Sequence, residues 1–226
     1  PFAVRWEVVE TVAVDHARIG GDAGAERARD DRWAPAVWGC VAAALAFHVL
    51  TILRGSWAWL VAQVPDDAFY YPGIARHLGA GDGPTFDGLN QTNGFRPLWQ
   101  FLLVPLALAF PGDAALARAA MLLGVVLGLT GVVLVARFLR PVVGAPAAAL
   151  GALLAIHGAV GTKWLRNGME SSVLVLALSL LLLALGRFDR ARDRRSALLV
   201  GLACGVVVLA RMDVAVVVAV VPVVLA

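Results

Sequence analysis

The sequence contains few charged side chains. Asp, Glu, Lys and Arg together make up 15% of its 226 residues, whereas a typical soluble domain has about a quarter. Hydrophobic residues make up 60% of the chain, and the mean hydropathy is +0.80. This composition excludes an ordinary soluble domain and indicates a membrane protein.

Cysteine and clustered basic residues are scarce as well. Cys40 and Cys204 each lie inside an apolar run, which offers neither a disulfide framework nor a metal-binding pattern. We interpret both as small core residues. The net charge is +3, and no basic stripe alternates with aromatic residues, so nucleic acid is not an expected partner.

Residues 1–33 lack a cleavable signal and any hydrophobic periodicity. They mix Arg, Asp, Glu and Gly, so we expect a poorly ordered polar tail on the cytoplasmic side. The chain begins at Pro1 without Met and stops at Ala226 inside an apolar run. We therefore expect residues 34–226 to be a truncated transmembrane module.

The first long apolar run, Ala34–Leu53, has about the length that a bilayer requires. Tryptophans mark its edges as in an aromatic belt, with Trp33 and Trp38 at the start and Trp57 and Trp59 at the end. The later apolar runs are Leu98–Phe110, Ala114–Ala136, Ala145–Val160, Val173–Gly186, Ala197–Ala210 and Val214–Ala226. This pattern predicts an all-α, polytopic membrane protein.

The run Leu98–Phe110 decides the topology. It has 13 residues, a length more typical of an interfacial or re-entrant helix than of a span. If it does not cross, Arg137, Arg140 and the five arginines of residues 187–195 share the side of the N-terminal tail; if it crosses, they lie outside. Short Arg-rich loops belong in the cytoplasm, so we expect that it does not cross.

This topology makes residues 54–113 one large extracytoplasmic loop with a membrane-lying helix at its end. It also places the segment GTKWLRNGMESS, residues 161–172, on the same outer side. The Ala-, Arg- and Val-rich composition is typical of bacteria, so we expect a multi-pass protein of the bacterial cytoplasmic membrane.

The stretch PDDAFYY places two carboxylates side by side in the outer loop. Pro65 suits the first turn of a helix, where Asp66 and Asp67 are favoured by the helix dipole. Gly79 and Gly81 can end this helix. Capping is therefore one interpretation of the acids. A functional role is the other, because ionisable groups close to a bilayer are costly and usually functional.

Aromatic residues and turns follow the acids. The faces of Phe69, Tyr70 and Tyr71 suit sugar rings or isoprenoid tails, and they equally suit anchoring at the membrane interface. The next stretch, GAGDGPTFDGLNQTNGFRPLWQ, is dense in Gly, Asp and Asn, which predicts tight turns and not strands.

The run DDAFYYPGIARHLGAGDGPTFDGLNQTNGFRPLW resembles the first outer loop of bacterial GT-C type glycosyltransferases. These multi-span enzymes use polyprenyl-phosphate sugars and are related to arabinofuranosyltransferases and protein mannosyltransferases. RNGMESSVLVLALSLLLLAL and GLACGVVVLARMD resemble the Gly-hydrophobic-Glu motif of this group and its following span with an Arg-x-Asp end. The resemblance covers residues 34–226 and implies a GT-C-like bundle whose first outer loop contains membrane-lying helices.

The resemblance also implies that Asp66 is the catalytic base and that Asp67 is its partner. The base would take the proton of a glycan, lipid or protein hydroxyl that attacks the anomeric carbon. A retaining reaction needs a second carboxylate on the opposite face of the sugar ring. Adjacent acids on one helix turn cannot supply it, so we expect inversion.

Three cations on the outer side are candidates to stabilise the leaving phosphate: Arg96, Lys163 and Arg166. Each is also explained as an interfacial residue whose charged end reaches water. Glu170 either orients one of these cations or caps the next span, and Tyr70 is expected to contact substrate.

No cofactor is expected. Two close carboxylates could hold a divalent cation, but a lysine and arginines can neutralise a lipid monophosphate, so we expect no metal. A non-enzymatic carrier or flippase of lipid-linked sugars is the alternative function. It would place polar residues at mid-membrane depth, whereas here they gather at the outer surface. An inactive fragment of a split enzyme is a third possibility.

Overall fold

The structure, a computed structural model, describes residues 34–225, and every regular element in this part of the chain is a helix. The expectation of an all-α protein is confirmed for these residues. The expected cytoplasmic tail, residues 1–33, lies outside them.

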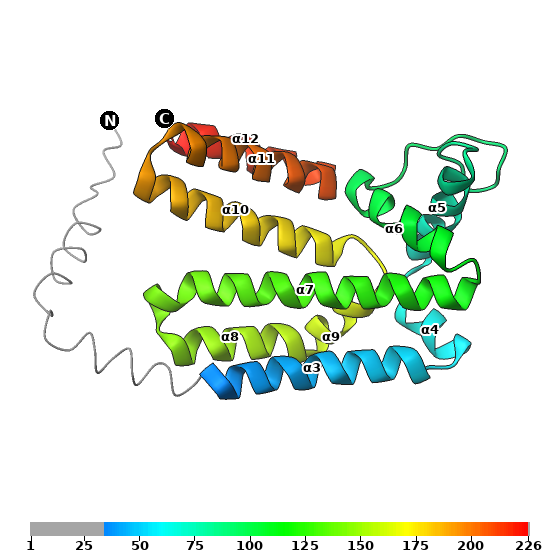
Figure 1. Ribbon diagram of the computed structural model, residues 1–226, viewed down its shortest axis with the longest axis horizontal. Coiled ribbons are helices and arrows are strands. Elements are labelled where there is room, and N and C mark those ends of the chain that lie inside the picture. The colour runs from blue at the N-terminus through cyan, green and yellow to red at the C-terminus, as the bar shows by residue number, and fades with distance from the viewer. Residues whose placement is uncertain (1–33, 226) are drawn as a thin grey trace, which may run out of the picture.

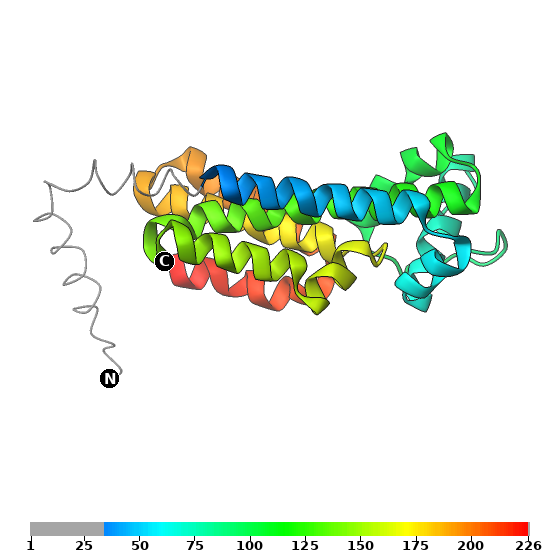
Figure 2. The ribbon, with the colours of Figure 1, turned by 90° about the horizontal axis from the view of Figure 1, so that it is seen from below.

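Long helices run side by side as a bundle, and shorter elements gather at one end of it (Figures 1 and 2). The bundle helices are α3 (Ala34–Arg54), α7 (Asp113–Val143), α8 (Ala145–His157), α10 (Ser171–Ala191), α11 (Arg194–Ala210) and α12 (Ala215–Leu225). The shorter elements are α4 (Trp57–Gln63), the 3-10 turn η1 (Asp66–Phe69), α5 (Tyr70–Ala80), α6 (Pro97–Ala109), α9 (Ala159–Arg166) and the 3-10 turn η2 (Met212–Val214).

Successive bundle helices run in opposite directions, so their connections alternate between the two ends (Figure 1). One end carries residues 55–112, the turn between α9 and α10, and η2. The opposite end carries the α7–α8 and α10–α11 connections. The two polar segments that the sequence assigns to the outer side therefore lie at one end of the bundle.

Within the described residues, two helices are long and apolar enough to cross a membrane: α7 with 31 residues and α10 with 21. The pair of α8 and α9 is a third candidate, bent by 62°. The apolar stretches of α3, α6 and the C-terminal helix are shorter. The predicted run Ala145–Val160 is not one straight helix, because α8 ends at His157 and Gly158 takes an extended backbone.

Helix α7 is central and packs against α3, α8, α9 and α10. It packs tightly on α10 at Gly131, where a Cβ would lie 2.9 Å from the Leu176 nitrogen and 3.0 Å from its Cα. The Ser179 hydroxyl donates a hydrogen bond of 3.0 Å to the Gly131 carbonyl. Small residues let membrane helices approach closely, so the missing side chain of Gly131 allows the close packing of α7 on α10 at this point.

Arg118 of α7 holds the end of α3. Its Nε donates to the Ile52 carbonyl at 3.2 Å and its Nη2 to the Gly55 carbonyl at 2.8 Å. The last carbonyl groups of a helix have no partner inside that helix. The guanidinium supplies one and fixes the point where the chain leaves α3 for α4.

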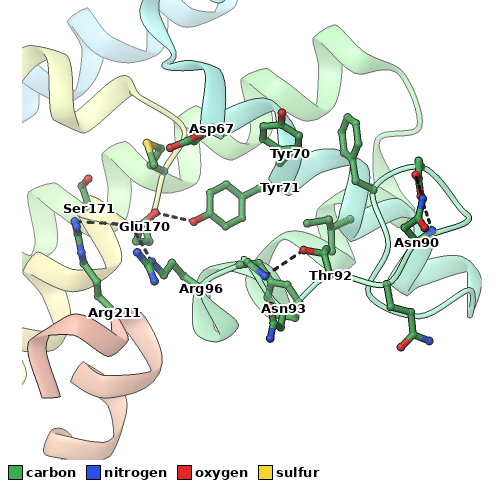
Figure 3. A pocket seen from close by; sticks show the side chains of 17 residues that line it. Asp67, Tyr70, Tyr71, Asn90, Thr92, Asn93, Arg96, Glu170, Ser171 and Arg211 are labelled. Carbon is green, nitrogen blue, oxygen red and sulfur yellow. Dashed lines mark hydrogen bonds and ion pairs between the residues drawn. The ribbon is translucent and has the colours of Figure 1, made fainter.

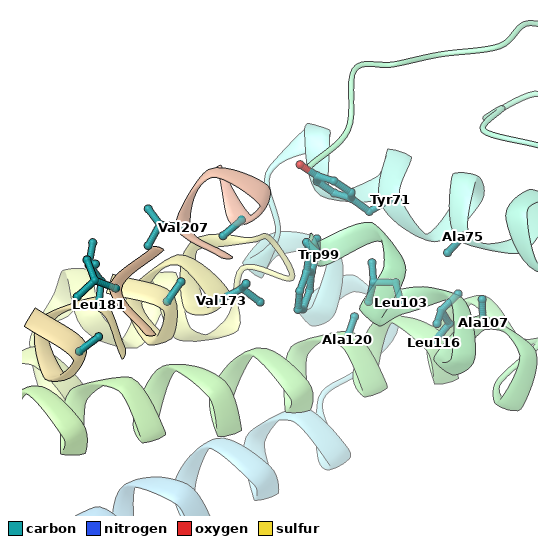
Figure 4. Close-up of a cluster of buried hydrophobic side chains, with 14 residues drawn as sticks. Tyr71, Ala75, Trp99, Leu103, Ala107, Leu116, Ala120, Val173, Leu181 and Val207 are labelled. Carbon is teal, nitrogen blue, oxygen red and sulfur yellow. The ribbon is translucent and has the colours of Figure 1, made fainter. Parts of the chain in front are cut away.

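Helix α6 inserts one face into the largest apolar cluster (Figure 4). Trp99, Leu103 and Ala107 are buried on that face. Phe101 and Leu108, on another face, are 64% and 66% exposed. Large exposed apolar side chains mark a contact surface, which is compatible with the membrane-lying helix that the sequence predicts here.

We expect Gly131→Ala to lower the free energy of unfolding by about 1–3 kcal/mol, because the added methyl group overlaps the α10 backbone. Gly151→Ala on α8 is the matched control, since no atom lies within 4 Å of a Cβ there. Alanine is favoured over glycine in a helix, so this variant should be neutral or more stable. Unfolding in detergent measures both. Equal stability of the two variants would contradict the packing of α7 on α10.

Candidate active site

Asp66 and Asp67 lie in η1, which follows Pro65 and leads directly into α5. Helix α5 ends at Gly81, whose φ of 92° favours glycine. Both carboxylates are exposed, and neither has a hydrogen-bond or ion-pair partner within residues 34–225. Capping hydrogen bonds therefore do not account for the acid pair.

A cavity of about 650 Å³ opens beside η1 (Figure 3). Its size is typical of ligand pockets. Asp67 lines this first cavity, together with Tyr70, Arg96 and Glu170, whereas Asp66 is not among the lining residues. The structure thus brings four of the seven predicted site residues around one space.

Glu170 is 2% exposed and has three partners at the edge of the first cavity. The Tyr71 hydroxyl donates to its Oε2 at 3.1 Å. Arg96 Nε lies 3.6 Å and Arg211 Nη1 lies 3.8 Å from its Oε1. The Glu170 side chain makes no capping hydrogen bond to α10. Of the two roles considered from the sequence, it therefore has the geometry to orient cations.

Burial and the Glu170 carboxylate raise the pKa of the Tyr71 phenol above its ordinary value, which is about 10. The phenol is a donor only while it keeps its proton. The hydrogen bond from Tyr71 to Glu170 is therefore fully present at pH values below the ordinary pKa of a phenol. It is lost as the pH rises through the raised pKa of Tyr71.

The turn that presents Glu170 is held by side-chain hydrogen bonds. Trp99 Nε1 donates to the Gly168 carbonyl at 3.1 Å. The Asn167 side chain accepts from a backbone N–H two residues on, at 3.0 Å, and donates to the Ser171 hydroxyl at 3.3 Å. Gly168 has a φ of 66°, where a side chain is strained. The stretch Arg-Asn-Gly-Met-Glu is thus a turn that fixes the carboxylate against the cavity.

Arg211, at the end of α11, is a site residue that the sequence analysis did not assign. Its Nε lies 3.0 Å from both carboxylate oxygens of Asp213. This hydrogen bonding raises the pKa of Arg211 and lowers the pKa of Asp213. The sequence signal that could have identified Arg211 is the pattern Arg-x-Asp at the end of an apolar helix.

Residues 85–93 form a further wall of the first cavity. Asp87 accepts two backbone hydrogen bonds and one from the Asn90 amide, at 2.8–2.9 Å. These bonds lower the pKa of Asp87, so it is ionised at neutral pH. The rings of Tyr70 and Phe86 lie with centroids 4.8 Å apart. The lining from this segment includes Phe86, Asp87, Asn90, Gln91, Thr92 and Asn93.

Arg166 does not reach the first cavity. Its Nη1 donates to the Thr51 hydroxyl at 3.4 Å, and its guanidinium lies 5.4 Å from the Trp59 ring centroid and 5.8 Å from that of Phe47. These contacts point it toward α3 and α4. The grouping of Arg166 with the other predicted cations is therefore not found.

Lys163 is exposed and lines a second cavity of about 440 Å³ between α4 and α9. This second cavity is lined by Ala62, Gln63, Val64, Pro65, Val160, Lys163, Trp164 and Asn167. Most of these side chains are apolar.

Two short segments, residues 64–68 and 167–170, form the wall between the cavities. They meet at Gly168, where a Cβ would lie 3.4 Å from Val64 Cγ1. The second cavity is lined by Val64, Pro65 and Asn167, which come first in the two segments. The first cavity is lined by the later residues Asp67, Met169 and Glu170. Asp66 lies in this wall, between the residues of its segment that line either cavity.

No group of three His, Cys, Asp or Glu side chains in the described part of the chain is placed to hold a metal ion. The chain matches no family model, no curated protein and no solved structure.

We expect Tyr71→Phe to lower the free energy of unfolding by about 1.5–3 kcal/mol, because it removes a hydrogen bond to a buried carboxylate. Tyr70→Phe is the matched control, since the Tyr70 hydroxyl has no hydrogen-bond partner among the described residues. That variant should stay within about 0.5 kcal/mol of the parent. Thermal unfolding in detergent compares the two. A Tyr71→Phe protein as stable as the control would mean that the bond to Glu170 contributes nothing.

Proposed function

We propose that the protein is a GT-C-like glycosyltransferase. It transfers a sugar from a polyprenyl phosphate to a hydroxyl group of a cell-envelope glycan, a lipid or a protein. The reaction takes place at the outer face of the bacterial cytoplasmic membrane, which the chain crosses several times. Residues 54–113 are the first extracytoplasmic loop, with α6 lying in the membrane surface.

The observation that carries this proposal is an exposed acid pair without partners, one member of which lines a cavity. Asp67 lines the first cavity, and Asp66 lies in the wall between the two cavities. Amide and aromatic side chains of residues 85–93 supply hydrogen-bonding groups and flat faces that suit a sugar ring. The apolar bundle beside this site supports a donor that is carried by a lipid.

In the proposed reaction, Asp66 accepts the proton of the acceptor hydroxyl. The hydroxyl oxygen attacks the anomeric carbon while the bond from that carbon to the phosphate oxygen breaks, and the lipid phosphate leaves with the electron pair. Asp67 assists from the wall of the first cavity. Both acids come from one turn of the chain and cannot supply a second carboxylate on the opposite face of the sugar, so a single displacement by the hydroxyl oxygen inverts the configuration.

Glu170 contributes by holding Arg96 and Arg211 at the edge of the first cavity. A buried carboxylate needs such partners, because an unpaired charge in a protein interior is costly. The guanidinium groups are thereby kept in place to donate hydrogen bonds to the substrate. This makes Glu170 a positioning residue in the proposal.

Asp66→Asn is expected to lower the transfer rate by about 10²–10⁴-fold, the usual contribution of a general base. Transfer is measured in membranes with radiolabelled polyprenyl-phosphate arabinose, mannose, galactose and glucose. Asp67→Asn is assayed in parallel to measure how much the second acid contributes to the transfer rate. Asp82→Asn is the control, because Asp82 is an exposed acid after α5 that, unlike Asp66, is paired, with His77 Nδ1 at 2.9 Å, and lies outside both cavity walls.

Normal turnover of Asp66→Asn, at normal protein levels in the membrane, would remove Asp66 from the mechanism. A carrier or flippase would bind the lipid without needing either acid. An inactive fragment would transfer none of the four sugars.

The topology has its own test. In a protein with Cys40 and Cys204 replaced by alanine, a membrane-impermeant thiol reagent should label Asp82→Cys from the outside of intact cells and should leave Arg192→Cys unlabelled. Both positions are exposed; Asp82 directly follows the cap of α5 and Arg192 caps α10, and these two helix ends lie at opposite ends of the bundle (Figure 1). The reverse labelling pattern would place the cavities on the cytoplasmic side and defeat the proposal.

A further inference from the structure

The two ends of the bundle differ in charge. Within residues 34–225, the end with the cavities carries seven basic and seven acidic side chains, so its formal charge is zero. The opposite end, where α7 meets α8 and α10 meets α11, carries seven arginines and two aspartates, and its formal charge is +5 (Figure 1). The seven are Arg137, Arg140 and the five arginines of residues 187–195. We call these seven side chains the arginine surface.

The arginine surface is one continuous feature, because the ends of α7 and α10 touch. A Cβ at Gly186 of α10 would lie 2.7 Å from Phe138 Cε2 of α7. Phe138 lies between Arg137 and Arg140 in sequence, and Gly186 directly precedes Arg187. Arg137 and Arg187 are both exposed. Gathering like charges costs Coulomb energy, which an anion bound among them would offset.

The two aspartates at this end are already engaged. Asp189 pairs with Arg192, whose Nη2 lies 3.1 Å from its Oδ1. Asp193 is the N-cap of α11 and accepts a backbone hydrogen bond of 2.7 Å from the first turn of that helix. Three exposed arginines have no hydrogen-bond or ion-pair partner among the described residues: Arg190, Arg194 and Arg195. Their charge is available to a ligand.

Arginine also occupies positions that the local backbone disfavours. Arg192 caps α10 with a φ of 47°, a left-handed conformation that favours glycine. Arg194 and Arg195 lie in the first turn of α11, which contains no acid, although the helix dipole disfavours cations there. Departures from local rules are expected at functional sites. The chain therefore accepts a local cost to keep these cations at the end of the bundle.

The apolar surroundings favour a lipid over a soluble anion. Val142, near the end of α7, is 80% exposed, and Leu198 and Leu202 of α11 are 59% and 68% exposed. A guanidinium group binds phosphate through two parallel hydrogen bonds. An anionic phospholipid can therefore place its phosphate among the arginines and its acyl chains along the exposed apolar side chains. Basic clusters directly at the ends of membrane helices bind such lipids.

We propose that the arginine surface binds the phosphate heads of anionic phospholipids of the surrounding membrane. In the proposed topology these lipids lie in the cytoplasmic leaflet, at the end of the bundle away from both cavities. They hold this end of α7, α10 and α11 at the membrane surface and take no part in sugar transfer. The inference uses neither the acid pair nor the cavities, so it goes beyond the proposed function.

Lipid retention tests this proposal. The purified full chain in neutral detergent is mixed with equal amounts of phosphatidylglycerol and phosphatidylcholine of the same acyl chains, and native mass spectrometry counts the lipids retained. The protein should retain phosphatidylglycerol over phosphatidylcholine by about tenfold or more, because several basic residues contribute. Glycerol phosphate, which has a phosphate and no acyl chain, should not displace it at equal concentration. Equal retention of the two lipids would overturn the proposal, and displacement by glycerol phosphate would make the ligand a soluble anion.

Variants identify the cations. Arg194→Gln should lower the retention ratio by about fivefold, the contribution of one basic residue near anionic lipid, and Arg194→Lys should keep most of it. Arg194→Gln should be at least as stable to heat as the parent, because it removes a cation from a helix start, so its loss of lipid cannot be ascribed to misfolding. Arg54→Gln is the matched control, since it removes one exposed cation at the opposite end of the bundle. An unchanged ratio for Arg194→Gln, or an equal loss for Arg54→Gln, would contradict the site.

The lipid measurement and the transfer assay fail independently. If phosphatidylglycerol is retained through Arg194 but no sugar is transferred, the lipid site stands and the glycosyltransferase proposal fails. If transfer depends on Asp66 while the protein retains both phospholipids equally, the glycosyltransferase proposal stands and the lipid site is wrong.

Discussion

The buried carboxylate of Glu170 is the constraint on which the first cavity depends. A charge that is almost fully withdrawn from water must be paired and hydrogen-bonded, because its desolvation is otherwise too costly. Its partners Tyr71, Arg96 and Arg211 come from α5, from the residue before α6 and from the end of α11. Satisfying one carboxylate therefore requires four distant segments of the chain to meet at one end of the bundle, where they enclose the cavity.

The turn that presents Glu170 also forms part of the wall between the two cavities. Trp99 in the apolar core holds the Gly168 carbonyl, and Gly168 leaves room for Val64 at close range. The contact separates a cavity lined by amides, aromatic rings and paired charges from an apolar cavity with one free ammonium.

Much of the local structure could be predicted from the sequence, because it depends on short-range signals. Proline, paired acids and glycines bound the η1–α5 segment, and apolar runs mark the bundle helices. The break at Gly158 was missed because a glycine inside an apolar run does not by itself end a helix. The diversion of Arg166 toward Trp59 and Thr51 was missed for a different reason: its partners lie on helices more than a hundred residues away in sequence.

The sequence by itself determined that this protein is helical and apolar, and it marked which polar residues are unusual, because composition and periodicity are properties of the chain alone. Only the tertiary structure decided which of those polar residues face each other. In the tertiary structure, Tyr71 and Arg211 are partners of Glu170. Arg166 lies against Trp59 and Thr51, and Lys163 lines the second cavity. The physical reason is that burial and charge pairing are set by the packing of helices whose contacts span the whole chain.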